Sequence, residues 1–345
     1  MNFKINKGII NIVIYILGVC LIFLIPVGIM KLSDKKLENG NEIKTSNEKG
    51  YIDKSKLNLN NVKVNYKGQI MNLGLEEYVT LGVASEMPAN FDEEALKAQS
   101  ILVRSFVLTR KIYNCQNANG AEICSTTHCQ VFTPKNERMS SWGLKANEYY
   151  EKISKAVKAT EGMVLSYDGN LAMHPQYFAV SSGRTEDSIA VFSEDIPYLK
   201  SVESEGEEIA PKYKIDKTFS VKEFLNIINS NYKNANLNSG NYKNQINILS
   251  RNLGGTVKEI KLGGEILKGT EVRKLLDLNS ANFTISYNGK NIIVTALGYG
   301  HDVGMSQWGA NVRAKNGEKY EGILEHYFSG CKIQNVNKVN FNGRQ

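Results

Sequence analysis

Glu86 is the first residue whose position suggests proton chemistry, because it stands between an apolar run and Pro88 in the stretch GVASEMPANF. If the preceding helix ends just before Glu86, its C-terminal carbonyls face the carboxylate and raise its pKa. Burial against Met87, Pro88 and Phe91 would raise the pKa further. A carboxyl group that stays protonated near neutral pH can protonate the leaving oxygen of a glycosidic bond. From position alone, an exposed acid at a helix end is the simpler interpretation.

Two basic residues could line a site beside Glu86. Lys97 and Arg104 are seven residues apart and share one face of the next predicted helix. They would either reach into the site as a pair of cations or extend along the helix edge toward solvent, which is common for long basic side chains.

Two polar stretches add candidates for substrate binding. YFAVSSGRTEDS begins at Tyr177 and carries Ser181 and Ser182, whose hydroxyls could bind sugar hydroxyls or amides, although a polar turn explains them too. This stretch lacks the G-x-S-x-G pattern of a serine nucleophile. GYGHDVGMSQWGA crowds four glycines around His301 and Gln307, which implies tight backbone geometry or close approach of another group. The glycine spacing does not match the dinucleotide pattern G-x-G-x-x-G.

Three cysteines gather with His128 in NCQNANGAEICSTTHCQVF. Soft metals such as zinc favour thiolate and imidazole ligands, whereas a disulfide is the main competitor outside the cell. We expect Cys124 and His128 to hold a metal, and Cys115 and Cys129 to form a disulfide. A Cys124–Cys129 bridge that leaves Cys115 free is the alternative, and the sequence does not exclude it.

Hydrophobic periodicity predicts the elements that position these residues. A helix from about residue 75 is stopped by Pro88, and Asn90 or Asp92 is the expected cap of a second, buried helix. Two β-rich runs around Asn288-Gly289 predict a hairpin. Helices and strands mix without a βαβ rhythm, so the expected fold class is α+β. The other predicted elements are helices at 141–160, 219–232, 305–317 and 320–330, and strands at 163–169 and 174–185.

The chain divides into an anchor, a linker and a body. Residues 1–30 are the predicted membrane anchor, because the run 8–30 is apolar, uncharged and long enough for a transmembrane helix. No small-residue cleavage site precedes Lys31, which favours an uncleaved anchor over a signal peptide. Residues 31–60 are polar and aperiodic, as in a tether. Residues 61–345 are expected to form the body, as one large or two closely packed domains.

The charge of the chain limits the class of partner only in part. The formal net charge is +7, and the lysines are spread along the chain rather than gathered in a basic arm. A diffuse positive surface suits an anionic polymer or a membrane face, and by itself does not choose between nucleic acid, teichoic acid and peptidoglycan. The charges on either side of the apolar run do not settle the orientation of the chain in the membrane. A short N-terminal stub before a large body favours an extracytoplasmic body.

Several long motifs resemble those of the stage II sporulation protein D family and occur in the family's order. They span roughly residues 65–331 and are LEEYVTLGVASEMPANFDEEALKAQSILVRSF, STTHCQVF, YFAVSSGRTED, GHDVGMSQWGA and ILEHYFSG. The family's catalytic glutamate lies in the E-M-P motif and matches Glu86. Lys97, Arg104, Ser181 and Ser182 match motif positions and are carried over as candidate groove residues. Asp302 stands where the family often has a glycine.

The resemblance implies a membrane-anchored lytic transglycosylase of endospore-forming bacteria. Such a protein cleaves the MurNAc–GlcNAc bond of denuded peptidoglycan strands during engulfment of the forespore and leaves 1,6-anhydro-MurNAc ends. The implied location is the septal space between mother cell and forespore. The implied partners are glycan strands and stage II sporulation proteins P and M, with protein P stripping the stem peptides, and no nucleic acid. A structural zinc ion at Cys124 and His128 is also implied, and the chemistry itself requires no cofactor.

A single placed carboxylate suits this mechanism better than hydrolysis. Most glycoside hydrolases need two carboxylates at the bond. A transglycosylase needs only one, because the sugar's own C6 hydroxyl replaces water. The family also contains amidase-enhancer proteins, so a non-catalytic glycan-binding or amidase-activating module is the alternative. A retaining hydrolase that pairs Glu86 with Glu186 or Asp187 is a further one.

Overall fold

The computed structural model of the chain describes residues 52–342. The predicted anchor at residues 1–30 and most of the predicted linker at 31–60 lie outside this range. Within residues 52–342, no helix is both long enough and apolar enough to cross a membrane. The described part mixes helices with short antiparallel and parallel strand pairs, so the predicted α+β class is confirmed.

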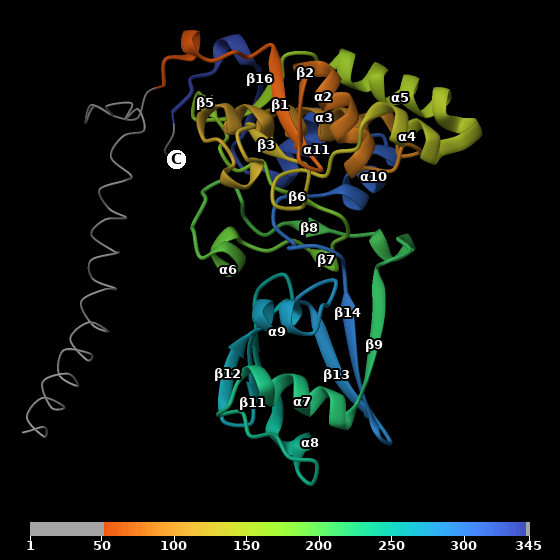
Figure 1. Cartoon of the computed structure of the whole chain (residues 1–345), viewed down its shortest axis with the longest axis vertical. Helices are drawn as coiled ribbons and strands as arrows, with labels where there is room; N and C mark the ends of the chain where they lie inside the picture. The colour runs from red at the N-terminus through yellow and green to blue at the C-terminus, as the bar shows by residue number, and fades with distance from the viewer. Residues whose placement is uncertain (1–51, 343–345) are drawn as a thin grey trace, which may run out of the picture. The chain divides into compact units, whose positions relative to one another are not determined.

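One long helix, α3, forms the centre of the first hydrophobic core. Its residues from Ala95 to Thr109 are almost all buried. The Asp92 carboxylate accepts a hydrogen bond from the Glu94 N–H at 2.9 Å, so Asp92 rather than Asn90 caps the helix. Figure 1 shows the helices around α3, and each of the following contacts it: α2 (Leu75–Glu86), α5 (Ala146–Ala159), α10 (Gln307–Lys315) and α11 (Tyr320–Tyr327), with α3 itself spanning Glu93–Ile112.

Short strands complete the first core. Strand β1 pairs antiparallel with β2 and parallel with β3, while β4 lies between β5 and β16. The strand predicted over 174–185 is reduced to β6 and β7, which pair with different partners, β15 and β8. The bounds are β1 Asn61–Tyr66, β2 Gln69–Gly74, β3 Ile123–Cys124, β4 Met163–Tyr167, β5 Asn170–Leu171, β6 Tyr177–Phe178, β7 Gly183–Arg184, β8 Glu203–Ser204, β15 Met305–Ser306 and β16 Lys332–Asn335.

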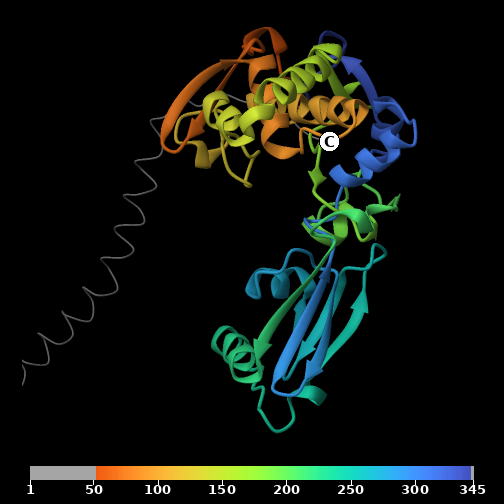
Figure 2. The same ribbon diagram turned by 90° about the vertical axis from the view of Figure 1, so that its right-hand side faces the viewer.

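A second hydrophobic core is built by residues that lie between β8 and β15 in the sequence. The hairpin predicted around Asn288-Gly289 is confirmed as β13 and β14, and β9 pairs with the other edge of β14. Figure 2 shows these three strands side by side. The bounds are β9 Lys214–Ser220, α7 Val221–Asn231, α8 Tyr242–Gln245, β10 Ile246–Arg251, β11 Val257–Leu262, β12 Glu265–Lys268, α9 Gly269–Leu275, β13 Phe283–Asn288 and β14 Asn291–Leu297.

The helix predicted at 141–160 is interrupted. Helix α4 ends at Trp142, and Gly143 has a φ of 55°, a left-handed conformation that favours glycine and stops the helix. The chain then re-enters a helix at α5. The remaining short elements are η1 Lys54–Lys56, η2 Gln116–Ala118, α4 Lys135–Trp142, η3 Gly143–Lys145, α6 Ser188–Phe192, η4 Glu207–Ile209 and η5 Val336–Lys338.

Candidate active site and cysteine–histidine cluster

Glu86 is the last residue of α2, and its carboxylate is held from outside the helix. The backbone N–H of Val131 donates a hydrogen bond to Glu86 Oε1 at 2.5 Å. Burial raises the pKa of Glu86 to about 7, although the Val131 N–H and the Tyr177 hydroxyl both lower it. The prediction of a raised pKa is therefore confirmed, and burial rather than the helix carbonyls is its cause. The group can both give and accept a proton near neutral pH.

The segment that carries Val131 runs along the end of α2. Two residues further on, the Thr133 N–H donates to the hydroxyl of Ser85 at 3.0 Å. Between them, the buried Phe132 ring stacks on Tyr78 of α2 with 5.4 Å between the ring centroids. These contacts fix the backbone donor that faces Glu86.

Tyr177 reaches the same carboxylate from strand β6. Its buried hydroxyl lowers the pKa of Glu86, and burial together with the nearby Glu86 charge raises the pKa of Tyr177 well above its usual value. Of the predicted substrate-binding residues, Tyr177 is the one that the structure brings directly to Glu86.

The three clustered cysteines and His128 meet at one point. The Nδ1 atom of His128 lies 3.4 Å from Cys115 Sγ, 3.7 Å from Cys124 Sγ and 3.6 Å from Cys129 Sγ. All four candidate ligand atoms lie within 4.8 Å of one another. Cys115 and Cys129 are free thiols, so the predicted disulfide between them is wrong, and the alternative Cys124–Cys129 bridge is also absent. Each of the three sulfur atoms lies beside the His128 imidazole, and no two of them are joined in a disulfide.

This donor set fits a tetrahedral zinc ion. Zinc–sulfur and zinc–nitrogen bonds of about 2.3 and 2.0 Å place tetrahedral ligand atoms about 3.5–3.8 Å apart. The distances from His128 Nδ1 to the three sulfurs agree with this. A Cys₃His set without a carboxylate or an open ligand position is typical of structural rather than catalytic zinc sites. Cys331 is also a free, buried thiol and lies outside the cluster.

Comparison with known proteins places the chain in a family. A family model described as "Stage II sporulation protein" matches residues 64–167. Stage II sporulation protein D of Bacillus subtilis (strain 168) is 38% identical over 266 residues, which are 76% of this chain and 75% of that protein. The chain belongs to the stage II sporulation protein D family. The protein of the same name from Bacillus amyloliquefaciens is 36% identical over the same shares.

A second kind of relative is more distant. The amidase enhancer of Bacillus subtilis (strain 168) is 25% identical over 298 residues, which are 73% of this chain and 39% of that protein. This chain is therefore a sporulation protein of the stage II sporulation protein D family with a distant similarity to an amidase enhancer.

Arg104 does not line a groove in this family member. Its guanidinium is fully buried and donates to both oxygens of Glu76, at 2.8 and 2.6 Å. It also donates to the Met163 carbonyl at 2.9 Å and the Val157 carbonyl at 3.4 Å. The predicted substrate contact is wrong, because these partners occupy the guanidinium and tie α2, α3, α5 and β4 together.

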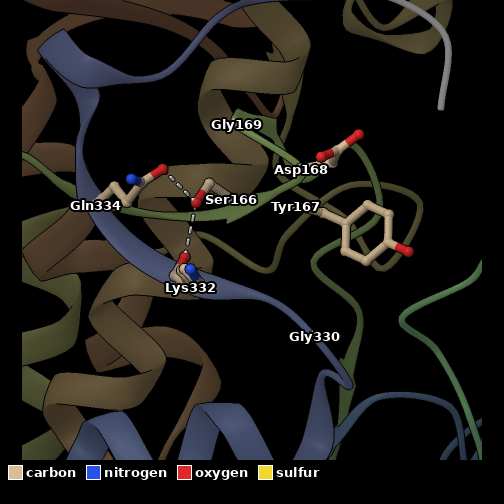
Figure 3. A pocket seen from close by; sticks show the side chains of 7 residues that line it. All are labelled: Ser166, Tyr167, Asp168, Gly169, Gly330, Lys332 and Gln334. Atoms are coloured by element: carbon tan, nitrogen blue, oxygen red, sulfur yellow. Dashed lines mark hydrogen bonds between the residues drawn. The ribbon is translucent and has the colours of Figure 1, made fainter.

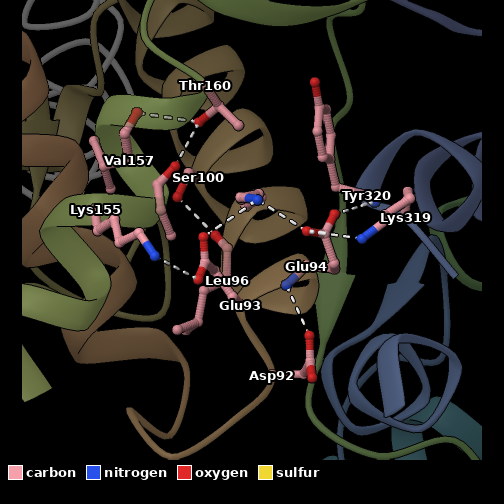
Figure 4. A network of polar contacts seen from close by, with 12 residues as sticks. Asp92, Glu93, Glu94, Leu96, Ser100, Lys155, Val157, Thr160, Lys319 and Tyr320 are labelled. Atoms are coloured by element: carbon pink, nitrogen blue, oxygen red, sulfur yellow. Dashed lines mark hydrogen bonds and ion pairs between the residues drawn. The ribbon is translucent and has the colours of Figure 1, made fainter. Parts of the chain in front are cut away.

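Lys97 lies in an ion network at the start of α3, and Figure 4 labels its partners Glu93 and Glu94. Its ammonium is 2.8 Å from Glu94 and 3.3 Å from Glu93, and its side chain is only 16% exposed. Glu94 also accepts a hydrogen bond from the Tyr320 N–H at 3.1 Å, so the network links α3 to α11. The Lys97 ammonium is therefore occupied by ion pairs within the protein, and its role in binding substrate stays a prediction.

The serine-rich stretch packs on a buried carboxylate rather than on a ligand. Ser181 has no exposed surface, and its N–H donates to Glu207 Oε2 at 2.8 Å. The Ser182 hydroxyl accepts a hydrogen bond from Asn282 at 2.8 Å and remains partly exposed. Burial makes Ser181 unsuitable as a direct substrate ligand, which corrects that prediction.

His301 and Gln307 occupy structural positions. The His301 ring lies between Phe178 and Phe192, with centroids 5.7 and 5.4 Å away, and burial lowers the pKa of His301 to about 4. Gln307 is 5% exposed and donates to Gln99 at 3.4 Å. Gln307 is thus too deeply buried to meet a substrate directly, whereas His301 stays a neutral, partly exposed candidate.

The two candidates for the second carboxylate of a hydrolase, Glu186 and Asp187, both contact other chain segments. Glu186 is 1% exposed, and it accepts hydrogen bonds from the Gly254 N–H and from the N–H and hydroxyl of Thr256. Asp187 accepts from the Ser201 N–H at 2.7 Å. Glu186 is therefore occupied by internal donors, whereas Asp187 is partly exposed and its pairing with Glu86 stays an alternative.

An open pocket of about 450 Å³ lies at the β4–β5–β16 sheet, and its lining includes neither Glu86 nor the cysteines. Figure 3 shows the Ser166 hydroxyl between Gln334 and Lys332, at 2.8 Å from the Gln334 side chain and 2.9 Å from the Lys332 carbonyl. These polar groups already satisfy one another, so we assign the pocket no ligand.

Val131 and Gln130 are the residues near Glu86 that sequence reasoning missed. Both follow Cys129 within the STTHCQVF motif, so the motif contains them, but their residue types do not point to a role. A backbone donor such as the Val131 N–H leaves no mark on residue type, and a single glutamine has no recognisable spacing.

Proposed function

We propose that this chain is a peptidoglycan lytic transglycosylase in which Glu86 is both the acid and the base. The observation that carries the proposal is one half-buried glutamate with a pKa of about 7 and a backbone donor fixed at 2.5 Å. Family membership supports a cell-wall substrate at the sporulation septum. The strands expected as substrate are denuded, with the body of the protein on the extracytoplasmic side.

The reaction balances with one carboxyl group. The Glu86 carboxyl protonates the oxygen that joins C1 of MurNAc to GlcNAc, and the C1–O bond breaks. The resulting carboxylate takes the proton from the C6 hydroxyl of the same MurNAc, and O6 bonds to C1. The products are a 1,6-anhydro-MurNAc end and a free GlcNAc hydroxyl, and Glu86 is again protonated. No water-activating carboxylate is required, which agrees with the internal hydrogen bonds of Glu186.

The proposed zinc ion would be held by Cys115, Cys124, His128 and Cys129 and would act as a structural cross-link. The last of these ligands is followed directly by Gln130 and Val131 in the chain, so ordering the cluster would also order the N–H that faces Glu86. A transglycosylase has no water to activate, so the proposed chemistry places no demand on the metal.

The proposed partners follow from the substrate. Denuded strands require an amidase that first removes the stem peptides, the role expected of stage II sporulation protein P, and stage II sporulation protein M is the expected membrane partner. A second candidate function, activation of an amidase without cleavage, is favoured by the similarity to the amidase enhancer.

Cleavage by a matched pair of variants separates the two functions. The full chain, purified in detergent, is incubated with denuded glycan strands. Glu86→Gln should lose about a hundred- to ten-thousand-fold in cleavage rate while still binding strands, because an amide cannot deliver a proton. Glu161→Gln, at an exposed glutamate, is the control and should cleave normally. No cleavage by the wild type would favour the non-catalytic function, whereas undiminished cleavage by Glu86→Gln would place the chemistry at another residue.

A further inference from the structure

Two polar groups near Glu86 are buried without hydrogen-bond partners. Among the described side chains, the Tyr177 hydroxyl and the Gln130 Nε2 atom are both in this state. A buried polar group that is left unsatisfied lowers the stability of the fold. The chain places two such groups near the Glu86 carboxyl group, where apolar side chains of similar size would avoid this loss of stability.

Gln130 is fixed from two sides. Its neighbour in the chain, Val131, is bound to Glu86 through the backbone, and the side chain itself is 1% exposed. The Tyr78 hydroxyl donates to Gln130 Oε1 at 3.3 Å. Because the carbonyl end of the amide faces Tyr78, its NH₂ group is left as a donor on the other side. That donor is unpaired, and it lies close enough to the Tyr177 hydroxyl to lower the pKa of Tyr177.

Tyr177 is held on a rigid element. Strand β6 pairs in parallel with β15, with Tyr177 opposite Met305. The phenol therefore reaches Glu86 from a different chain segment than Val131 does. When the Gln130 NH₂ group donates to the Tyr177 hydroxyl, the hydroxyl hydrogen turns away from Gln130, and Glu86 is the acceptor beside it.

We propose that Tyr177 and Gln130 are positioning residues for the Glu86 carboxyl group, with Gln130 orienting the Tyr177 hydroxyl so that it donates to the carboxylate. The role of Tyr177 and Gln130 in cleavage rests on the proposed function, but their effect on the pKa of Glu86 does not. In the reaction, the carboxylate that remains after the first proton transfer would be held by two donors, the Val131 N–H and the Tyr177 O–H. Catalytic contacts of this kind are often long in the free enzyme and shorten when substrate binds.

The groups that face Glu86 set the expected direction of the effect. Burial raises the pKa of Glu86, while Val131 and Tyr177 lower it, and no lysine or arginine of the described residues contributes. Tyr78 is the other titratable group close by, and it is affected by Cys124 and Cys129 of the cluster. Loss of the Tyr177 hydroxyl removes one of the two donors, so the pKa of Glu86 should rise.

The test is a carboxyl-carbon NMR titration of the full chain labelled with ¹³C-glutamate, with the Glu86 signal assigned by its loss in Glu86→Gln. Tyr177→Phe should raise the pKa of Glu86 by about one unit, a tenfold change in proton affinity. Gln130→Met, which keeps the volume, should raise it by less. Tyr327→Phe is the matched control, because it removes a buried hydroxyl that contacts Ser204 at 2.6 Å instead of Glu86.

The outcomes separate this inference from the proposed function. An unchanged Glu86 titration in Tyr177→Phe, or an equal shift in Tyr327→Phe, would overturn the inference even if the wild type cleaves glycan. A shift in Tyr177→Phe alone would support it even if no cleavage were found. With an active wild type, the alkaline limb of the pH profile of kcat should move upward by the same amount in Tyr177→Phe, a change that a purely structural role would not produce.

Discussion

The Glu86 carboxylate accepts a hydrogen bond from the Val131 backbone N–H at 2.5 Å, across 45 positions of sequence. This contact joins the end of α2 to the segment that follows the cysteine–histidine cluster. Burial raises the pKa of Glu86 and the N–H lowers it, and the balance lies near 7. Whether Glu86 is protonated near neutral pH therefore depends on two parts of the chain that are far apart in the sequence and meet in the fold.

The cluster should bind about one zinc ion per chain. Elemental analysis of the purified protein should find zinc, and Cys124→Ser with His128→Ala should abolish it, because two of four ligands are lost. Cys331→Ser is the control, since this buried thiol lies outside the cluster, and it should retain the metal. Zinc-free wild type, or wild-type zinc content in the double variant, would contradict the assignment.

Arg104 should matter for stability rather than for binding. Arg104→Met leaves Glu76 without its ion pair and two carbonyls without a donor, so the free energy of unfolding should fall by about 3 kcal/mol. Lys155→Ala breaks an exposed pair with Glu93 at 3.3 Å and should cost less than about 1 kcal/mol. Denaturant unfolding measures both values. Equal stability of the Arg104→Met variant and the wild type would return Arg104 to the list of substrate ligands.

The contribution of Asp302 and Glu207 to stability should fall as pH rises from about 6.5 to 8.5. Burial raises the pKa of Asp302 to about 8 and that of Glu207 to about 7, above the values of the unfolded chain. The folded state therefore holds more protons than the unfolded state in this window, and the stability present at lower pH is lost as the pH rises through the folded values. His301, whose pKa is lowered to about 4, is neutral in the folded state, so it opposes this fall near pH 6.5, where the histidine of the unfolded chain is still partly protonated.

Asp302→Asn tests this dependence. Asp302 has a φ of 65°, the left-handed region in which asparagine is tolerated, so the substitution keeps the backbone and removes the titration. Its melting temperature should vary less between pH 6.5 and 8.5 than that of the wild type. An unchanged slope would show that Asp302 is charged throughout the window.

The sequence predicted regular elements well and irregular ones poorly. Pro88 correctly ended α2, and Asn288-Gly289 correctly marked the β13–β14 hairpin, because both signals are local. The strand expected over 174–185 failed, since its two short pieces pair with distant segments at β15 and β8. No local pattern encodes such partners.

The same distinction applies to the site. Glu86 was identified from its motif, and the structure gives it the raised pKa that the chemistry needs. Arg104 and Ser181 matched motif positions equally well, yet both are fully buried with internal partners. A motif match reports that a residue type is required and not whether it faces substrate or the interior.

Asp302 illustrates a departure from the family pattern that the fold tolerates. It stands where the family resemblance leads us to expect a glycine and adopts a left-handed conformation, with its carboxylate accepting from the Ser280 hydroxyl at 3.0 Å. Aspartate is among the few side chains that enter this region readily, so the local backbone is kept.

A conservative change at Glu86 should be as damaging as a drastic one. Glu86→Asp withdraws the carboxyl group by one methylene from the Val131 N–H and from the bond to be cleaved, so cleavage should fall at least a hundredfold. Rates on denuded strands measure this, with strand binding as the check that the site is intact. Cleavage by Glu86→Asp at more than a tenth of the wild-type rate would show that the position of the carboxyl group is not critical.

The most direct test of the central claim is the fate of oxygen in the product. Denuded glycan strands are digested by the full chain in water enriched in ¹⁸O, and the products are analysed by mass spectrometry. A transglycosylase that uses Glu86 as its only acid and base should give 1,6-anhydro-MurNAc ends without label, and Glu86→Gln should give almost none. Reducing ends that carry ¹⁸O would identify a hydrolase and contradict the account.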